Sequence, residues 1–216
     1  MLKPKRGGCV PQDTKEKNTE TALKKAFIKL VATKTFRKMT IRDIATTAHV
    51  SRGTFYLHYV DKYAMLTAYE DQLITGIKQI FAKYSKPSVY DGQDDEDNAF
   101  YHMFVYLNRE KQLVQTLYQI PESVIIRRMM VLITVEVASE SVDENLSTQK
   151  NEIPLEYARA ILVQNILGII TQWIRKDQPE SAHEIVKIFM DSRSLSPIDL
   201  ATFVQSDKRT GLNSTD

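Results

Sequence analysis

The sequence has little cysteine, little glycine and no long apolar run, and each shortage excludes a class of protein. Cys9 is the single cysteine, so the chain cannot form an internal disulfide, which favours a reducing compartment. Only 7 of 216 residues are glycine and alternating apolar-polar stretches are scarce, which favours helix over strand. The most apolar stretch, ILVQNILGII at 161–170, is interrupted by two polar residues, which suits a packed helix and not a membrane span.

The first residues, MLKPKRGGCVPQDTKEKN, are basic but contain no apolar run of the kind that a secretory signal needs. The expected location is therefore the cytoplasm. Motifs for enzymatic chemistry are also missing, because the sequence shows no phosphate loop, dinucleotide fingerprint, nucleophile elbow or spaced metal ligands. We expect no catalytic residues, no metal site and no cofactor, and hence a protein that is not an enzyme.

Charge is distributed unevenly, although the net charge of the chain is only +2. Residues 1–86 carry 17 Lys and Arg against 7 Asp and Glu, whereas the remaining residues carry 12 against 20. A basic first part and an acidic second part indicate a division of labour, with a polyanion as the partner of the first.

Four helices are predicted in the basic part. The first covers 18–34, where apolar residues recur every three to four positions. Thr40 is expected to cap a second helix at 41–49, with Asp43 completing a capping box. Ser51 is expected to cap a very short third helix at 52–58, and Asp61 a fourth that runs to about Lys83.

The acidic part is predicted to be helical as well. Helices are expected at 98–108, at 109–119 with Asn108 as its cap, from Pro121 onward, from Pro154 to about Lys176, at 179–192, and as a short final helix from Ser196. The predicted domains are a disordered basic tail at 1–17, a helix-turn-helix domain at 18–66 whose fourth helix continues to about 83, a second helical domain at 84–207 and a tail at 208–216. The expected fold class is all-α.

Two short helices joined by a tight turn are the arrangement with which many proteins place a helix in a DNA groove. An ordinary helical hairpin has the same pattern, but the residues are more specific than the pattern. The segment SRGTFYLHYVDK at 51–62, followed by a long helix, resembles the TetR family of transcriptional regulators. The resemblance covers residues 18–66 well, and beyond Lys83 it extends only to the architecture.

The resemblance implies DNA contacts along this segment. Arg52, Gly53 and Tyr56 correspond to positions at base edges, where Arg can bind guanine and Gly allows a close approach of the backbone. Arg42 resembles a further base or groove contact. Phosphate contacts, or helix caps close to the DNA, are expected at Thr40, Ser51, Thr54, His58 and Lys62.

Two roles are expected in the second domain. Such regulators bind DNA as homodimers, which read the two halves of an inverted repeat. The predicted interface residues are Ile161, Ile166, Ile169, Ile170, Ile185, Ile188 and Phe189, and the alternative for each is the core of a single chain. An effector pocket is expected among aromatic and Met side chains, which suit an apolar ligand but would equally form a core. The predicted pocket residues are Phe100, Met103, Phe104, Tyr118, Met129 and Trp173.

The sequence therefore predicts a homodimeric repressor that a small apolar or amphipathic effector releases from a palindromic operator in double-stranded DNA. The alternative keeps the DNA reader and makes the protein an activator, or a regulator controlled by a protein partner. A further alternative is architectural DNA binding without sequence preference, which predicts a steep salt dependence.

Overall fold

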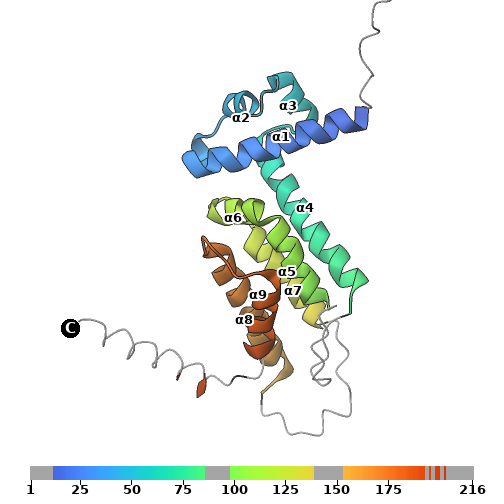
Figure 1. Cartoon of the computed structure of the whole chain (residues 1–216), viewed down its shortest axis with the longest axis vertical. Helices are drawn as coiled ribbons and strands as arrows, with labels where there is room; N and C mark the ends of the chain where they lie inside the picture. The colour runs from blue at the N-terminus through green and yellow to red at the C-terminus, as the bar shows by residue number, and fades with distance from the viewer. Residues whose placement is uncertain are drawn as a thin grey trace, which may run out of the picture. The chain divides into compact units, whose positions relative to one another are not determined.

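The computed structural model describes residues 12–85, 98–138 and 153–192, with a few isolated positions between 195 and 202. Within these ranges the chain is all-α, as the sequence predicts, and contains no strand (Figure 1). No helix in the described ranges is long and apolar enough to cross a membrane.

The elements follow the chain in a simple order. They are α1 (Gln12–Thr33), the 3-10 helix η1 (Phe36–Lys38), α2 (Ile41–Thr47), α3 (Arg52–His58), α4 (Lys62–Lys83), α5 (Ala99–Arg109), α6 (Lys111–Gln119), α7 (Ile125–Ala138), α8 (Leu155–Arg175) and α9 (Ala182–Ser192).

The chain forms two compact units. The first contains the residues up to 78 together with 110–132, so α6 and the start of α7 belong with α1, α2, α3 and most of α4. The second contains 79–109 and the residues from 133 onward, and its core lies among α5, α8 and α9. The predicted domain boundaries follow chain order and stay predictions.

Several predicted helix ends are corrected. Helix α1 begins at Gln12, where a tail was expected, because DTKEKNTE contains several good helix formers. Helix α6 has Glu110 and not Asn108 at its N-cap position, without a side-chain cap. The helix expected from Pro121 begins only at Ile125, after a turn in which the Ser123 N–H donates to the Ile120 carbonyl. Residues 86–97 of the predicted linker, residues 143–152 of the predicted loop and most of the predicted final helix lie outside the described residues.

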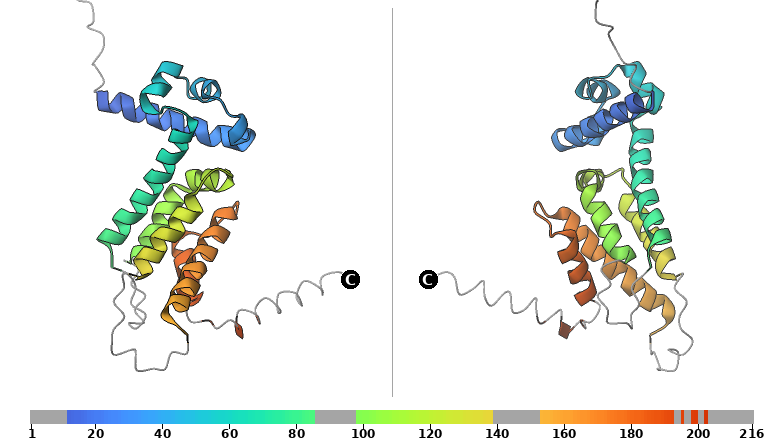
Figure 2. Two further views of the ribbon diagram at one scale, coloured as in Figure 1. Left: turned by 180° about the vertical axis from the view of Figure 1, so that it is seen from behind. Right: turned by 45° about the vertical axis from the view of Figure 1, so that its right-hand side comes forward.

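The core of the first unit joins α1, η1, α3 and α4. Phe27 is fully buried, with its ring centroid 5.2 Å from that of Tyr69 and 6.2 Å from that of Phe36. Phe55, from α3, is also fully buried, so this short helix is anchored by one large apolar side chain. Figures 1 and 2 show α2 and α3 side by side against α1.

The core of the second unit is aromatic. The ring of Phe100 lies 5.4 Å from that of Phe81 and 4.8 Å from that of Phe189, which connects α4, α5 and α9. Phe104 meets Trp173 of α8 edge to face, with centroids 5.9 Å apart. The indole N–H of Trp173 donates to the carbonyl of Glu180, so its polar group is satisfied although the residue is buried.

Candidate nucleic-acid interface

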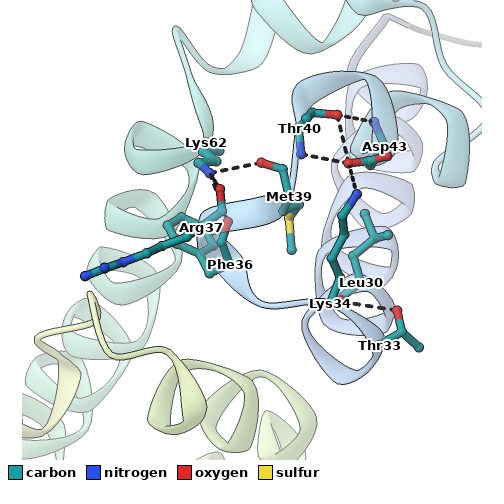
Figure 3. Close-up of polar contacts among 9 residues, drawn as sticks. All are labelled: Leu30, Thr33, Lys34, Phe36, Arg37, Met39, Thr40, Asp43 and Lys62. Carbon is teal, nitrogen blue, oxygen red and sulfur yellow. Dashed lines mark hydrogen bonds and ion pairs between the residues drawn. The ribbon is translucent and has the colours of Figure 1, made fainter.

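The start of α2 is held by the predicted capping box. The Thr40 hydroxyl accepts a hydrogen bond from the Asp43 N–H, and the Thr40 N–H donates to Asp43 Oδ2 at 2.8 Å (Figure 3). Lys34 Nζ lies 2.7 Å from the same carboxylate oxygen. The Lys34 ammonium and the two Thr40 donors lower the pKa of Asp43 from 3.8 to about 2. The carboxylate is therefore ionised, and it is already bonded to Lys34 and Thr40.

The turn between α2 and α3 contains a residue in the left-handed region. His49 has φ 56°, a value that is sterically unfavourable for a residue with a Cβ atom. The Val50 N–H donates to the Ala45 carbonyl at 2.9 Å, which closes the turn. The sequence did not indicate this conformation, because a glycine would be its usual signal.

Helix α3 has one buried side and one exposed side. Ser51 caps its start by accepting from the Thr54 N–H at 2.9 Å, and its hydroxyl shares a second hydrogen bond with the Thr54 hydroxyl. Phe55 points into the core, whereas Arg52, Gly53 and Tyr56 are exposed. The exposed residues are those that the family resemblance places at base edges.

Lys62 is bound within the protein. Its Nζ donates to the carbonyl oxygens of Phe36, Arg37 and Met39 at 2.8–2.9 Å (Figure 3). The ammonium also lies 5.0 Å from the ring centroid of Phe36. Because an ammonium has three N–H donors, all of them are used on backbone carbonyls around η1. In this structure Lys62 therefore supports the chain that leads into α2, and it has no donor left for a phosphate.

His58 also faces a partner inside the first unit. Its Nδ1 lies 3.6 Å from Oε2 of Glu20 on α1, and the Tyr59 hydroxyl donates to the other oxygen of Glu20 at 2.7 Å. Burial and the Glu20 carboxylate raise the pKa of Tyr59, so the phenol keeps its proton and remains a donor. Glu20 thus ties the end of α3 to α1.

The segment that leads through α2 and α3 is strongly basic. Residues 34–60 contain five Lys or Arg residues and one acidic residue, Asp43, whose carboxylate already binds Lys34 and Thr40. Arg42 and Lys38 are exposed near the start of α2, and Arg52 is exposed at the start of α3. This charge and the exposed side of α3 are complementary to a nucleic-acid backbone.

A polar cluster that the sequence did not reveal lies between α4 and α7. Glu70 is buried and accepts from the Ser123 hydroxyl at 2.6 Å and from the Val124 N–H at 2.7 Å, which holds the start of α7. Arg128 pairs with Glu70 and with Asp71. No local pattern indicates this cluster, since its partners are far apart in the sequence.

The predicted interface residues of the second unit divide into buried and exposed groups. Ile166, Ile170, Ile185 and Phe189 are buried within the chain, so their side chains have no surface left for a partner. Ile161 and Ile188 are exposed, and Ile169 is half-buried. The first four are therefore core residues, which was the alternative considered for each.

The predicted pocket residues belong to both compact units. Phe100, Met103, Phe104 and Trp173 are buried in the second unit. Met129 is buried in the first unit, and Tyr118, also in the first unit, is partly exposed. Phe100, Phe104 and Trp173 make the ring contacts of the second unit's core, and the pocket as a whole stays a prediction.

Two short capped helices, in a basic segment and with one side of the second helix exposed, define a helix-turn-helix DNA-binding protein. Family models agree with this class in both parts of the chain. Residues 25–69 match the model of bacterial regulatory proteins of the tetR family, and residues 94–193 match a transcriptional regulator C-terminal region of the same group. The chain belongs to the TetR family of DNA-binding transcriptional regulators, which are not enzymes.

A curated relative is also a helix-turn-helix transcriptional regulator. The HTH-type transcriptional regulator YxbF of Bacillus subtilis (strain 168), itself uncharacterised, is 30% identical over 98 residues. These residues are 45% of this chain and 22% of that protein, so the chain spans about a fifth of the relative's length.

Solved structures share the fold. A TetR transcriptional regulator from Streptococcus agalactiae 2603V is 19% identical, with a TM-score of 0.52 over 84% of this chain and 96% of that one. The fatty acid degradation regulator FadR from Bacillus halodurans is 14% identical, with a TM-score of 0.54 over 87% and 95%. The dihydroxyacetone kinase operon activator DhaS is 16% identical, with a TM-score of 0.51 over 81% and 95%.

Proposed function

We propose that the chain is a homodimeric repressor that binds an inverted repeat through α3 and leaves it when a small apolar or amphipathic effector binds. The observation that carries the DNA-reading part is the division of α3, in which Phe55 is buried while Arg52, Gly53 and Tyr56 are exposed. Arg52 would bind a guanine edge, and Tyr56 would contact an adjacent base. Arg42 would add a groove or phosphate contact.

Five other predicted contacts have partners within the chain. Thr40 and Ser51 act as helix caps, with Thr54 bonded to Ser51, and the ammonium of Lys62 is occupied by carbonyl oxygens. We assign these residues and His58, which faces Glu20, the task of orienting α2 and α3. Thr40, Ser51 and Thr54 are at the surface, where a nearby phosphate would accept from their hydroxyl groups in the complex.

The first experiment is selection of bound sites from a random duplex library at near-physiological salt. We expect an enriched inverted repeat, with binding reduced about tenfold or more by Arg52→Ala or Tyr56→Ala. Lys29→Ala is the matched control, because Lys29 is an exposed cation on α1. Lack of any enriched site, or equal loss with the control variant, would contradict the proposed reading of bases by α3.

Gly53 allows a separate test of close approach. A Cβ atom at this position would lie 3.5 Å from Ser51 Oγ, an ordinary contact, so Gly53→Ala should fold normally. The added methyl group would stand where the DNA approaches the backbone. We expect equal or higher thermal stability, because alanine favours helix more than glycine does, together with weaker operator binding. Unchanged affinity would place the DNA farther from the backbone of α3.

Dimerisation is proposed on the exposed apolar residues of α8 and α9. Ile161 is 62% exposed and Ile188 is 43% exposed, which is unusual for isoleucine. A Cβ atom at Gly168 would meet nothing within 4 Å, so this part of α8 is open within the chain. Ile161→Glu should lower the sedimentation mass toward that of a monomer. Val131→Glu, at an exposed position on α7, should not, and equal behaviour of the two variants would contradict this interface.

The effector is proposed to bind among Phe100, Met103, Phe104 and Trp173, which offer apolar and aromatic contacts. Helix α4 runs from the first unit into the second, so a ligand that shifts its end would change the spacing of the two recognition helices. Apolar and amphipathic compounds should raise the melting temperature and weaken operator binding. A saturating compound that stabilises the protein but leaves operator affinity unchanged would contradict the coupling.

The sign of regulation and the kind of effector need separate measurements. DhaS shares the fold and is named an operon activator, but at 16% identity this likeness concerns the fold alone. A reporter gene behind the selected site should be repressed by the protein, and activation would favour the alternative. Failure of small molecules combined with capture of a partner that changes operator affinity would favour control by a protein.

A further inference from the structure

An unusually exposed leucine lies on the recognition helix. Leu57 is 86% exposed, although leucine is among the residues most often buried. Its neighbour Phe55 on the same short helix is completely buried, so α3 already has its apolar anchor. Leu57 therefore contributes nothing to the core of the chain, and its exposure calls for an explanation at the DNA surface.

The spacing along α3 places Leu57 beside the proposed base contacts. Residues four apart lie on the same face of a helix, so Leu57 shares a face with Gly53, and Tyr56 shares the adjacent face with Arg52. Side chains on a helix lean toward its N-terminus and cover the preceding turn. Leu57 thus extends over the turn that contains Gly53, a position without a side chain. The apolar side chain of Leu57 and the uncovered backbone of Gly53 therefore lie on the same exposed face of α3.

The charged residues near Leu57 indicate which molecule its apolar side chain contacts. Helix α3 has no acidic residue, and Arg42, Lys38 and Arg52 are exposed on the segment that includes it. A basic segment of this kind fits the phosphates on both sides of a groove. Within the major groove, the apolar group that a base presents is the C5 methyl of thymine.

We propose that Leu57 is a specificity-determining residue that contacts the C5 methyl group of a thymine in each half-site. The inference rests on the proposed reading of DNA by α3 and adds a preferred base to it. Arg52 would select guanine by hydrogen bonds, whereas Leu57 selects thymine by excluding water from its methyl group. Cytosine lacks this methyl group and presents an amino donor, which an aliphatic side chain cannot satisfy.

The test is a double-mutant cycle between the protein and the base. In the selected operator, each thymine in turn is replaced by deoxyuridine, which removes the methyl group and keeps the base pair. A replacement in one half-site should weaken binding of the unmodified protein about fourfold, the value of burying one methyl group. The Leu57→Ala variant should bind the thymine and deoxyuridine duplexes equally. Val131→Ala, at an exposed aliphatic position on α7, should retain the fourfold difference.

The outcomes separate the two levels of the proposal. If Leu57→Ala keeps the full thymine preference, or if the selected half-site contains no thymine, Leu57 does not read a methyl group while the proposed function stands. If no site is enriched, or if Arg52→Ala binds its site as the unmodified protein does, the proposed reading of DNA by α3 is contradicted, and the proposal for Leu57 that rests on it is contradicted as well. Leu57→Ala should keep the melting temperature, because the side chain is exposed and alanine favours helix.

Discussion

Both compact units have aromatic side chains in their cores, but the first unit also depends on polar side chains that hold two very short helices. In the first unit, α2 and α3 have seven residues each, too few to be stable alone. Thr40 and Ser51 cap their starts, and Lys62 bonds to backbone carbonyl oxygens of the chain that leads into α2. In the second unit, longer helices meet through aromatic rings such as Phe100, Phe104 and Trp173. Hydrogen bonds fix the orientation of the short helices that are proposed to read DNA. Apolar packing tolerates substitutions of similar volume, so such a core can change its residues, and with them its ligand, without losing the fold.

The largest effect should come from the aromatic core of the second unit. Phe104 is completely buried against Trp173, so Phe104→Ala removes a large apolar side chain and leaves a cavity. We expect the free energy of unfolding to fall by about 4 kcal/mol, measured by urea denaturation. Tyr118→Ala, at a partly exposed aromatic position, is the control and should lose far less. Equal losses in the free energy of unfolding would mean that the burial of Phe104 does not add to its contribution to stability.

A somewhat smaller effect is expected from Glu70, the polar residue buried in the first unit. Glu70→Ala leaves the Val124 N–H and the Ser123 hydroxyl without their acceptor and removes a partner of Arg128. Stability should fall by about 3 kcal/mol. Asp71→Ala is the matched control, since Asp71 also pairs with Arg128 but is exposed. If both changes cost the same, the apolar surroundings and not the hydrogen bonds hold the start of α7.

Lys62 provides the sharpest test of directional bonding. Lys62→Met keeps the aliphatic stem but removes three hydrogen bonds to carbonyl oxygens, and should cost about 2 kcal/mol. Operator binding should weaken because the chain leading into α2 loses its support. The salt dependence of binding should keep its slope, since no phosphate contact is lost.

The slope of the salt dependence distinguishes the two possible roles of Lys62, which are support of the chain before α2 and contact with a phosphate. A slope reduced by about one unit for each subunit of the dimer would make Lys62 a phosphate contact in the complex, as the family resemblance implied. Lys29→Met, at an exposed position on α1, controls for the loss of one surface charge.

His49 should reveal the strain in the turn between α2 and α3. Glycine adopts φ 56° without the steric penalty that His49 meets, so His49→Gly should stabilise the protein by about 1 kcal/mol. His49→Val should destabilise it, because a β-branched side chain is still less compatible with positive φ. Chemical denaturation of the three proteins should give the order Gly, His, Val. Any other order would mean that the side chain of His49 contributes more than the backbone conformation.

The smallest effect concerns pH. Lys34 and Thr40 lower the pKa of Asp43 to about 2, below its ordinary value of 3.8. A lowered pKa in the folded state stabilises the protein above the unfolded value, and this contribution disappears as pH falls from about 4 to about 2. The difference in melting temperature between the unmodified protein and Asp43→Asn should therefore narrow over this range. A constant difference would mean that the capping box does not depend on the charge of Asp43.

The parts of the structure that could be predicted are those determined by near neighbours. The caps of Thr40, Ser51 and Asp61 act on N–H groups three residues away, so the residue types alone indicated them. Pro121 shows the limit of such reasoning. It suggested a helix start, but the helix begins at Ile125, where Glu70 of a different helix supplies the acceptor.

The amino-acid sequence by itself determined the helical class, the capped helix-turn-helix and the family, because helical periodicity, capping and a compact motif are local properties. Only the tertiary structure decided that Lys62 binds carbonyl oxygens, that Glu20 faces His58, and which isoleucines of α8 are core and which are exposed. These results depend on segments that are distant in the sequence and meet only after the chain folds. A lysine or an isoleucine is compatible with several environments, and its neighbours in space select one.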